Sequence, residues 1–247
     1  MQNGLQIMFK RLKEKIFADH NQVEQKEWMF YIDYLKEGMV VFDIGANIGD
    51  LTTLYSHFVR NNGKVYSFEP TPCTFDKLAK TVENTGRKNV VLNNIALSET
   101  IGELEFNLYP EEFSSWNTIV DRPLEKYGIL LKPQNKVKVR SDTIDNYCKS
   151  NNIDSIDLLK IDVEGAELDV LNGAIEMFKW KKIKCCVFEY GQTIYDRGHS
   201  SKDINEFFKQ INYKIENVIT DDPIFPHDRK TKQALFSVHY AKPLKRL

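Results

Sequence analysis

Long apolar runs are absent from this sequence. No stretch approaches the roughly 18 consecutive apolar residues that indicate a membrane-spanning helix. Residues 10–16 mix basic and apolar side chains, and they lack the continuous apolar core and small-residue cleavage site of a secretory signal peptide. We therefore expect no stable membrane insertion.

Cysteine is scarce as well. The 247 residues include four cysteines, and no two of them form a C-x-x-C pair that would indicate a redox or metal site. Cys185 and Cys186 fall in a predicted buried strand, where packing explains them better than a disulfide or a metal. This use of cysteine fits a reducing compartment, and we expect a cytoplasmic protein.

A surplus of charge of either sign is also missing. Lysine and arginine number 34 against 35 acidic residues, which gives a formal net charge of −1. Binding to nucleic acid or to an anionic membrane usually requires a basic surplus. We therefore expect a small-molecule or glycan substrate and no nucleic-acid partner.

What the chain does have is the composition and the rhythm of one α/β domain. Hydrophobic residues make up 42% of it, and its length suits one sizeable domain better than two. From residue 39 onward, predicted strands alternate with predicted helices, which indicates a mostly parallel sheet with helices on both faces. The strands are predicted over residues 39–44, 64–68, 89–95, 156–161, 183–188, 213–218 and 234–240, and the helices over residues 51–60, 74–84, 166–179 and 202–210.

The N-terminal part departs from this alternation. Residues 1–37 carry apolar side chains at helical spacing and are predicted to form a helical extension that precedes a single domain over residues 38–247. We expect it to pack against the domain as a helix.

An insertion over residues 102–140 also interrupts the alternation. Its two ends alternate apolar and polar residues, as half-exposed antiparallel strands do. The polar loop between them, residues 109–134, is long for a compact domain, and we expect it to face the substrate as a lid. Its Ser115, Trp116 and Asn117 would offer hydroxyl, aromatic and amide groups to a polar ring.

The most informative segment is the run VVFDIGANIGD over residues 40–50. An apolar strand ends at Asp43, and a glycine-rich turn then leads into a helix whose first N–H groups are free. Dinucleotide sites use G-x-G-x-x-G to hold a pyrophosphate, which the Asp43 carboxylate would repel. The same carboxylate suits the cationic amino-acid part of S-adenosylmethionine.

Further acids follow other predicted strands. Glu69 ends the second strand, where nucleotide-binding sheets place an acid that accepts hydrogen bonds from ribose hydroxyls. Asp162 and Glu189 follow two later strands, so we expect all of these acids at one edge of the sheet. For Asp162 and Glu164, capping of the helix that follows remains an open alternative.

Several motifs together resemble the FkbM-type family of S-adenosylmethionine-dependent methyltransferases. They lie at residues 42–49, 68–70, 96–98, 143–147, 156–167 and 170–174, and the likeness covers roughly residues 38–192. The resemblance implies a Rossmann-like class I methyltransferase fold, with a seven-stranded, mostly parallel sheet and an antiparallel last strand. It also implies methylation of hydroxyl oxygens on sugars of glycans or on secondary metabolites.

The resemblance implies roles for individual residues. The methionine part of the cofactor would lie at Asp43, Gly45, Asn47 and Gly49, the ribose at Glu69 and Pro70, the adenine at the backbone of Ala96 and Leu97, and the transferred methyl at Asp162 and Glu164. Because an alcohol is barely ionised at neutral pH, a general base assists its methylation. Our candidates are Asp162, Glu164, Glu189 and, from a polar loop, His199.

Other interpretations stay open at this stage. The acids could instead bind a divalent cation, although no residue spacing is specific for a metal, and we predict none. A nucleotide-dependent oxidoreductase would use a related sheet, but no Tyr-x-x-x-Lys set is evident. A non-catalytic module with the same fold is a further alternative, which the retained acids do not favour.

Overall fold

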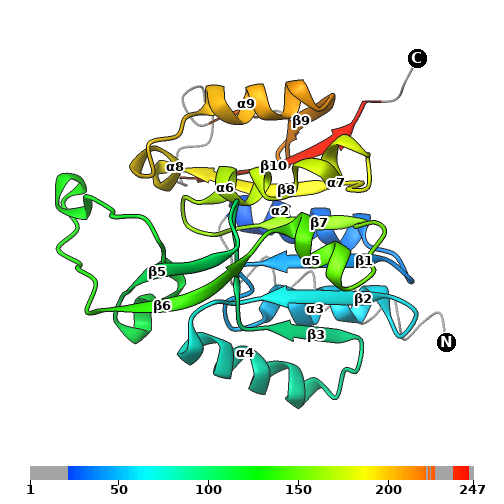
Figure 1. The fold of residues 1–247 in the computed structure, drawn as a ribbon, viewed down its shortest axis with the longest axis horizontal. Helices are drawn as coiled ribbons and strands as arrows, with labels where there is room; N and C mark the ends of the chain where they lie inside the picture. The colour runs from blue at the N-terminus through cyan, green and yellow to red at the C-terminus, as the bar shows by residue number, and fades with distance from the viewer. Residues whose placement is uncertain (1–21, 221, 223, 226–235, 245–247) are drawn as a thin grey trace.

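The computed structural model describes residues 22–220, 222, 224–225 and 236–244, and its centre is a seven-stranded sheet (Figure 1). The strand order is β3-β2-β1-β7-β8-β10-β9, and β10 runs antiparallel to both of its neighbours. The strands are β1 (Val40–Ile44), β2 (Lys64–Phe68), β3 (Val90–Asn93), β7 (Leu158–Ile161), β8 (Cys186–Gly191), β9 (Tyr213–Asn217) and β10 (Phe236–Pro243). The predicted mostly parallel sheet with an antiparallel last strand is confirmed.

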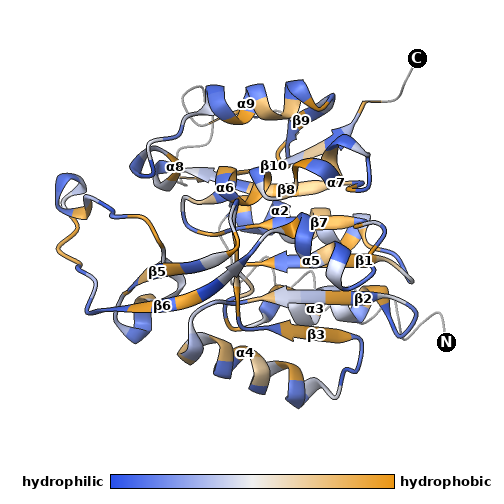
Figure 2. Ribbon diagram, in the orientation of Figure 1, coloured by the Kyte–Doolittle hydropathy of each residue, from blue (hydrophilic) through white to orange (hydrophobic). Residues whose placement is uncertain are grey.

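Helices cover both faces of this sheet because its strands are apolar on both sides (Figure 2). Along β1, Val41 packs on the side of α2 and α3, whereas Phe42 packs on the opposite side with α6, α7 and α9. The helices are α2 (Gln22–Tyr34), α3 (Asp50–Val59), α4 (Pro72–Thr85), α5 (Ile144–Ser150), α6 (Glu167–Asn172), α7 (Ile175–Lys179), α8 (Gln192–Asp196) and α9 (Ser201–Gln210). None of the helices in these residues is both long and apolar enough to cross a membrane.

Helix α2 shares the core of the domain. Its Val23, Tyr31 and Ile32 are buried, and the Tyr31 ring meets the Tyr55 ring of α3 edge-on at 5.0 Å between centroids. The first part of the expected helical extension, residues 1–21, lies outside the described residues.

The insertion forms a second, smaller sheet beside the first. Strands β5 (Gly102–Leu108) and β6 (Asn135–Asp142) pair antiparallel, as the alternating pattern predicts. A two-residue strand, β4 (Ala96–Leu97), joins β6 in parallel, which the pattern did not predict. The long loop contains two 3₁₀ helices, η1 (Glu111–Trp116) and η2 (Leu124–Tyr127), and it projects away from the main sheet (Figure 1).

The strand expected over residues 183–188 is β8 at Cys186–Gly191, so Glu189 lies within the strand and not after it. A helix also differs from its prediction. The helix expected over residues 166–179 is two helices, α6 and α7, separated at Gly173 and Ala174. The backbone of Ser98 approaches Gly173 so closely that a Cβ there would lie 2.0 Å from the Ser98 carbonyl oxygen. A contact between such distant segments leaves no trace in local periodicity.

Candidate active site

A cavity lies at the carboxyl ends of β1, β2, β7 and β8, between the main sheet and the insertion. It brings together most of the predicted site residues. Those that line it are Gly45, Asn47, Glu69, Pro70, Ala96, Leu97, Ser115, Asn117, Asp162, Glu164 and Glu189. Asp43, Gly49, Trp116 and His199 do not line it.

The turn after β1 forms one wall. Gly45 has φ +76°, and a Cβ there would lie 1.8 Å from the backbone oxygen of Asp162. The N–H groups of Gly45 and Ala46 both donate to the Phe68 carbonyl at 3.0 Å. The absence of a side chain at Gly45 therefore lets the β1 turn lie directly against the turn that follows β7.

Asp43 lies behind this wall, not in the cavity. It is fully buried, and its Oδ2 accepts a hydrogen bond from Thr52 Oγ1 of α3 at 2.5 Å. Burial raises the pKa of Asp43. Alternation along β1 turns its side chain toward α3 and away from the cavity, so the structure gives no support to the predicted direct contact with the cofactor.

Lys160 is a residue that the sequence analysis missed. Its Nζ donates to the Gly45 carbonyl at 3.1 Å and lies 3.2 Å from Asp162 Oδ2 and 3.7 Å from Asp43 Oδ1. Burial lowers the pKa of this ammonium, but the carboxylates of Asp162 and Asp43 outweigh it and the net pKa is raised. A lone lysine inside the apolar strand over residues 158–161 is the signal that could have revealed it.

Glu69 presents a fixed carboxylate at the end of β2. Its Oε2 accepts from Asn47 N at 3.1 Å, and its Oε1 accepts from Thr71 N at 3.0 Å and Thr71 Oγ1 at 2.6 Å. Burial raises the pKa of Glu69, whereas these hydrogen bonds act in the opposite direction. Apolar residues of the adjoining wall, among them Pro70, Ala96 and Leu97, lie beside it.

Asp162, Glu164 and Glu189 form an acidic wall. Burial, followed by repulsion from Asp162, raises the pKa of Glu164 to about 8. The pKa of Glu189 is also raised, first by burial and then by the charges of Asp162 and Glu164. Neither Asp162 nor Glu164 caps the next helix: α6 has no side-chain cap, and Glu167 accepts the N–H groups of Val163 and Gly165.

Two predicted residues have other partners. The Trp116 ring lies beneath the Arg122 guanidinium at 4.9 Å and meets Tyr109 edge-on, so it packs within the insertion and does not line the cavity. His199 lies outside the cavity, where its Nε2 is 3.4 Å from Asp169 Oδ1 of α6. Asp169 is buried and also accepts from Arg197 at 2.8 Å, so the structure gives His199 a carboxylate partner outside the cavity and no contact with the acidic wall among the hydrogen bonds of the described residues. Gly49 caps the N-terminus of α3 with φ +96°, a left-handed conformation that favours glycine.

The site contains carboxylates without a metal-binding arrangement. Among the residues that the structure describes, no group of three or more His, Cys, Asp or Glu side chains could hold a metal ion. The carboxyl groups can form hydrogen bonds and transfer protons in a partly desolvated cavity.

The sequence of this chain is similar to sequences of known proteins. The family model described as "Methyltransferase FkbM domain" matches residues 43–215. The hexuronic acid methyltransferase AglP of Haloferax volcanii is 26% identical over 61% of this chain and 56% of its own length. The 31-O-demethyl-FK506 methyltransferase FkbM of Streptomyces tacrolimicus is 28% identical over 77% of this chain and 78% of its own.

A solved structure shares the fold. The methyltransferase FkbM from Methylobacillus flagellatus KT aligns with a TM-score of 0.53 over 89% of this chain and 51% of that one. At 14% sequence identity, the likeness concerns the arrangement of the sheet and its helices.

Proposed function

The chain belongs to the FkbM family of S-adenosylmethionine-dependent methyltransferases, and on this premise we propose that it methylates a hydroxyl oxygen of a sugar or a secondary metabolite. The observation that carries the proposal is the acidic wall of Asp162, Glu164 and Glu189 beside the β1 turn. Two relatives, a hexuronic acid methyltransferase and a 31-O-demethyl-FK506 methyltransferase, support an oxygen acceptor by what they are named to methylate.

The residues present fit the methyl donor of the family, S-adenosylmethionine. Asn47 Oδ1 is buried without a hydrogen-bond partner and lies in the cavity wall, where the ammonium of the donor could satisfy it. Glu69 would accept the ribose hydroxyls, and the apolar wall at Pro70, Ala96 and Leu97 would lie beside the adenine. When bound, the donor supplies an electrophilic methyl group on a sulfonium.

Of the three acids, Glu164 suits the role of proton acceptor best. Its Oε2 lies 3.3 Å from Arg122 Nη1, and an adjacent cation favours the ionised form. Glu189 has acids around it, and burial and their charges raise its pKa, so it would act as a protonated hydrogen-bond donor to the acceptor. Asp162 forms an ion pair with Lys160 at 3.2 Å beside the β1 turn, so it suits the role of proton acceptor less well.

Glu164 would take the proton of the substrate hydroxyl as the new O–C bond forms. A general base of this kind contributes roughly a hundred- to ten-thousandfold in rate. Ser115 and Asn117 from the insertion would hydrogen-bond the remaining hydroxyls of a polar acceptor. The insertion over residues 102–140 would thus act as the acceptor-side lid of a domain over residues 38–247.

The side chains of the cavity bear on the kind of substrate, and the cysteines bear on the cellular compartment. The carboxyl groups of the acidic wall, with Ser115 and Asn117 beside them, would offer hydrogen bonds to a polyhydroxylated acceptor such as a sugar ring or a polyol metabolite, and we expect no nucleic-acid partner. All four cysteines are free thiols, which supports a reducing, cytoplasmic setting.

The experiment is transfer of an isotopically labelled methyl group from S-adenosylmethionine to a panel of neutral sugars, uronic acids and hydroxylated metabolites. Mass spectrometry and NMR locate the label in each product. We expect the label on a hydroxyl oxygen. Labelling of nitrogen or carbon alone would overturn the proposal.

A further inference from the structure

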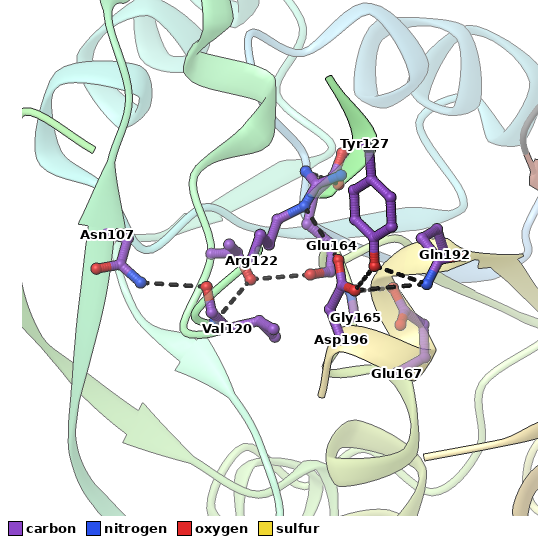
Figure 3. Close-up of polar contacts among 10 residues, drawn as sticks. Asn107, Val120, Arg122, Tyr127, Glu164, Gly165, Glu167, Gln192 and Asp196 are labelled. Atoms are coloured by element: carbon purple, nitrogen blue, oxygen red, sulfur yellow. Dashed lines mark hydrogen bonds and ion pairs between the residues drawn. The ribbon is translucent and has the colours of Figure 1, made fainter. Parts of the chain in front are cut away.

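Arg122 joins the insertion to the acidic wall. Its side chain is 10% exposed, and it lies between Glu164, at 3.3 Å from Nη1, and Asp196 of α8, at 3.8 Å from Nε (Figure 3). Its guanidinium also covers the Trp116 ring. A buried cation supplied by the insertion is therefore placed between two carboxylates that belong to the main domain.

The place of Arg122 is secured from both sides. Asp196, whose side chain is 1% exposed, accepts a hydrogen bond from Tyr127 of η2 at 2.5 Å, and the Tyr127 hydroxyl accepts one from Gln192 of α8 at 3.0 Å. Thr118 Oγ1 donates to the backbone carbonyl of Glu164 at 2.8 Å. The insertion thus contacts both the backbone and the side chain of the proposed base.

Most of the ionisable side chains around Glu164 are acidic. The charged and titratable groups that act on it or lie around it are Asp162, Glu167, Glu189, Tyr109, Lys160 and Arg122. Lys160 is already shared between Asp43 and Asp162. Removal of Arg122 would therefore leave a partly buried carboxyl beside uncompensated negative charge, which favours its protonated form.

We propose that Arg122 is a positioning residue that orients the Glu164 carboxylate and favours its ionised form only while the insertion is seated on Asp196 and α8. The inference rests on the proposed function for the role of Glu164 as proton acceptor. It adds that the reactive base is completed by the insertion, because the insertion supplies the cation that favours its ionised form.

The test measures the pKa of Glu164 directly, by NMR titration of the full chain labelled with ¹³C-glutamate, with Glu164→Gln used to assign its signal. Arg122→Met removes the cation and should raise the pKa of Glu164 by at least about one unit, the usual size of an opposite-charge effect at this distance. Arg122→Gln, which keeps hydrogen-bond donors toward Asp196, should shift it similarly and serves if Arg122→Met fails to fold.

The matched control is Lys77→Met. Lys77 of α4 pairs with Glu111 of η1 at 2.6 Å, so it also anchors the insertion, but through an exposed pair away from Glu164. It should leave the pKa of Glu164 unchanged.

A kinetic readout separates positioning from structure. The acidic limb of kcat should move to higher pH in both Arg122 variants, with kcat recovering toward the wild-type value above the shifted limb. An unchanged pKa of Glu164 in both variants, with hydroxyl methylation by the wild type intact, overturns the role of Arg122. Failure of the wild type to methylate any hydroxyl overturns the proposed function instead, whatever the titration shows.

Discussion

At the scale of single residues, the site depends on charges that are buried and compensated. Lys160 is the centre of one such set, because its ammonium contacts Asp43, Asp162 and the Gly45 carbonyl. The sequence identified the acids from their places at strand ends. It could not identify their partners, since a strand lysine has no motif and its contacts depend on the register between β1 and β7.

Replacement of Lys160 by methionine should destabilise the fold. Breaking a buried ion pair from one side leaves uncompensated charge and typically costs about 3–5 kcal/mol. We expect a loss of this size in the free energy of unfolding from denaturant titration, together with weaker donor binding. Lys64→Met, at an exposed position on β2, is the control and should change stability little. Equal stability of both variants would contradict the central place of Lys160.

The pH dependence of activity should report Glu164. A carboxyl must be ionised to accept a proton, and burial raises the pKa of Glu164 to about 8. The account therefore predicts that kcat/KM rises with pH through this region and levels off above it. Rate profiles across a constant-ionic-strength buffer series measure this. If kcat/KM instead rose in the ordinary pKa range of a carboxyl group, a group other than this form of Glu164 would be the proton acceptor.

At the scale of elements, local sequence patterns predicted the strands and turns better than they predicted the contacts between elements. Alternation correctly predicted the paired strands at both ends of the insertion, and the glycine turn after β1 was placed correctly. The break between α6 and α7, the roles of Trp116 and His199, and the contact of Arg122 with Glu164 were not predictable. Each depends on segments that lie far apart in the sequence.

The glycine turn offers a sharp test at this scale. Gly45→Ala combines an unfavourable positive φ with a clash against the Asp162 carbonyl. Gly86→Ala is the matched control, since Gly86 has φ +66° and open space around its Cβ direction. Gly86→Ala should cost only about 1 kcal/mol of strain. Gly45→Ala should cost clearly more and should also weaken donor binding in calorimetry. Equal effects would mean that the β1 and β7 turns separate easily.

At the scale of the whole molecule, the predicted class I methyltransferase fold and FkbM membership are confirmed. The parallel sheet explains why: its carboxyl ends converge, so acids spread over residues 43–189 arrive at one edge. The side of each strand on which an acid points then decides its role. Glu69 faces the cavity, whereas Asp43 supports the wall from behind.

The measurement that tests the central claim most directly is the turnover of Glu164→Gln, which keeps the shape of the side chain and removes its charge. With wild type and Glu189→Gln measured alongside at saturating acceptor above pH 8, the account predicts that Glu164→Gln lowers kcat about a hundredfold or more. The Kd for S-adenosylmethionine should stay nearly unchanged, and Glu189→Gln, which keeps a hydrogen-bond donor, should lose much less. Near-wild-type turnover in Glu164→Gln would contradict proton acceptance by this residue.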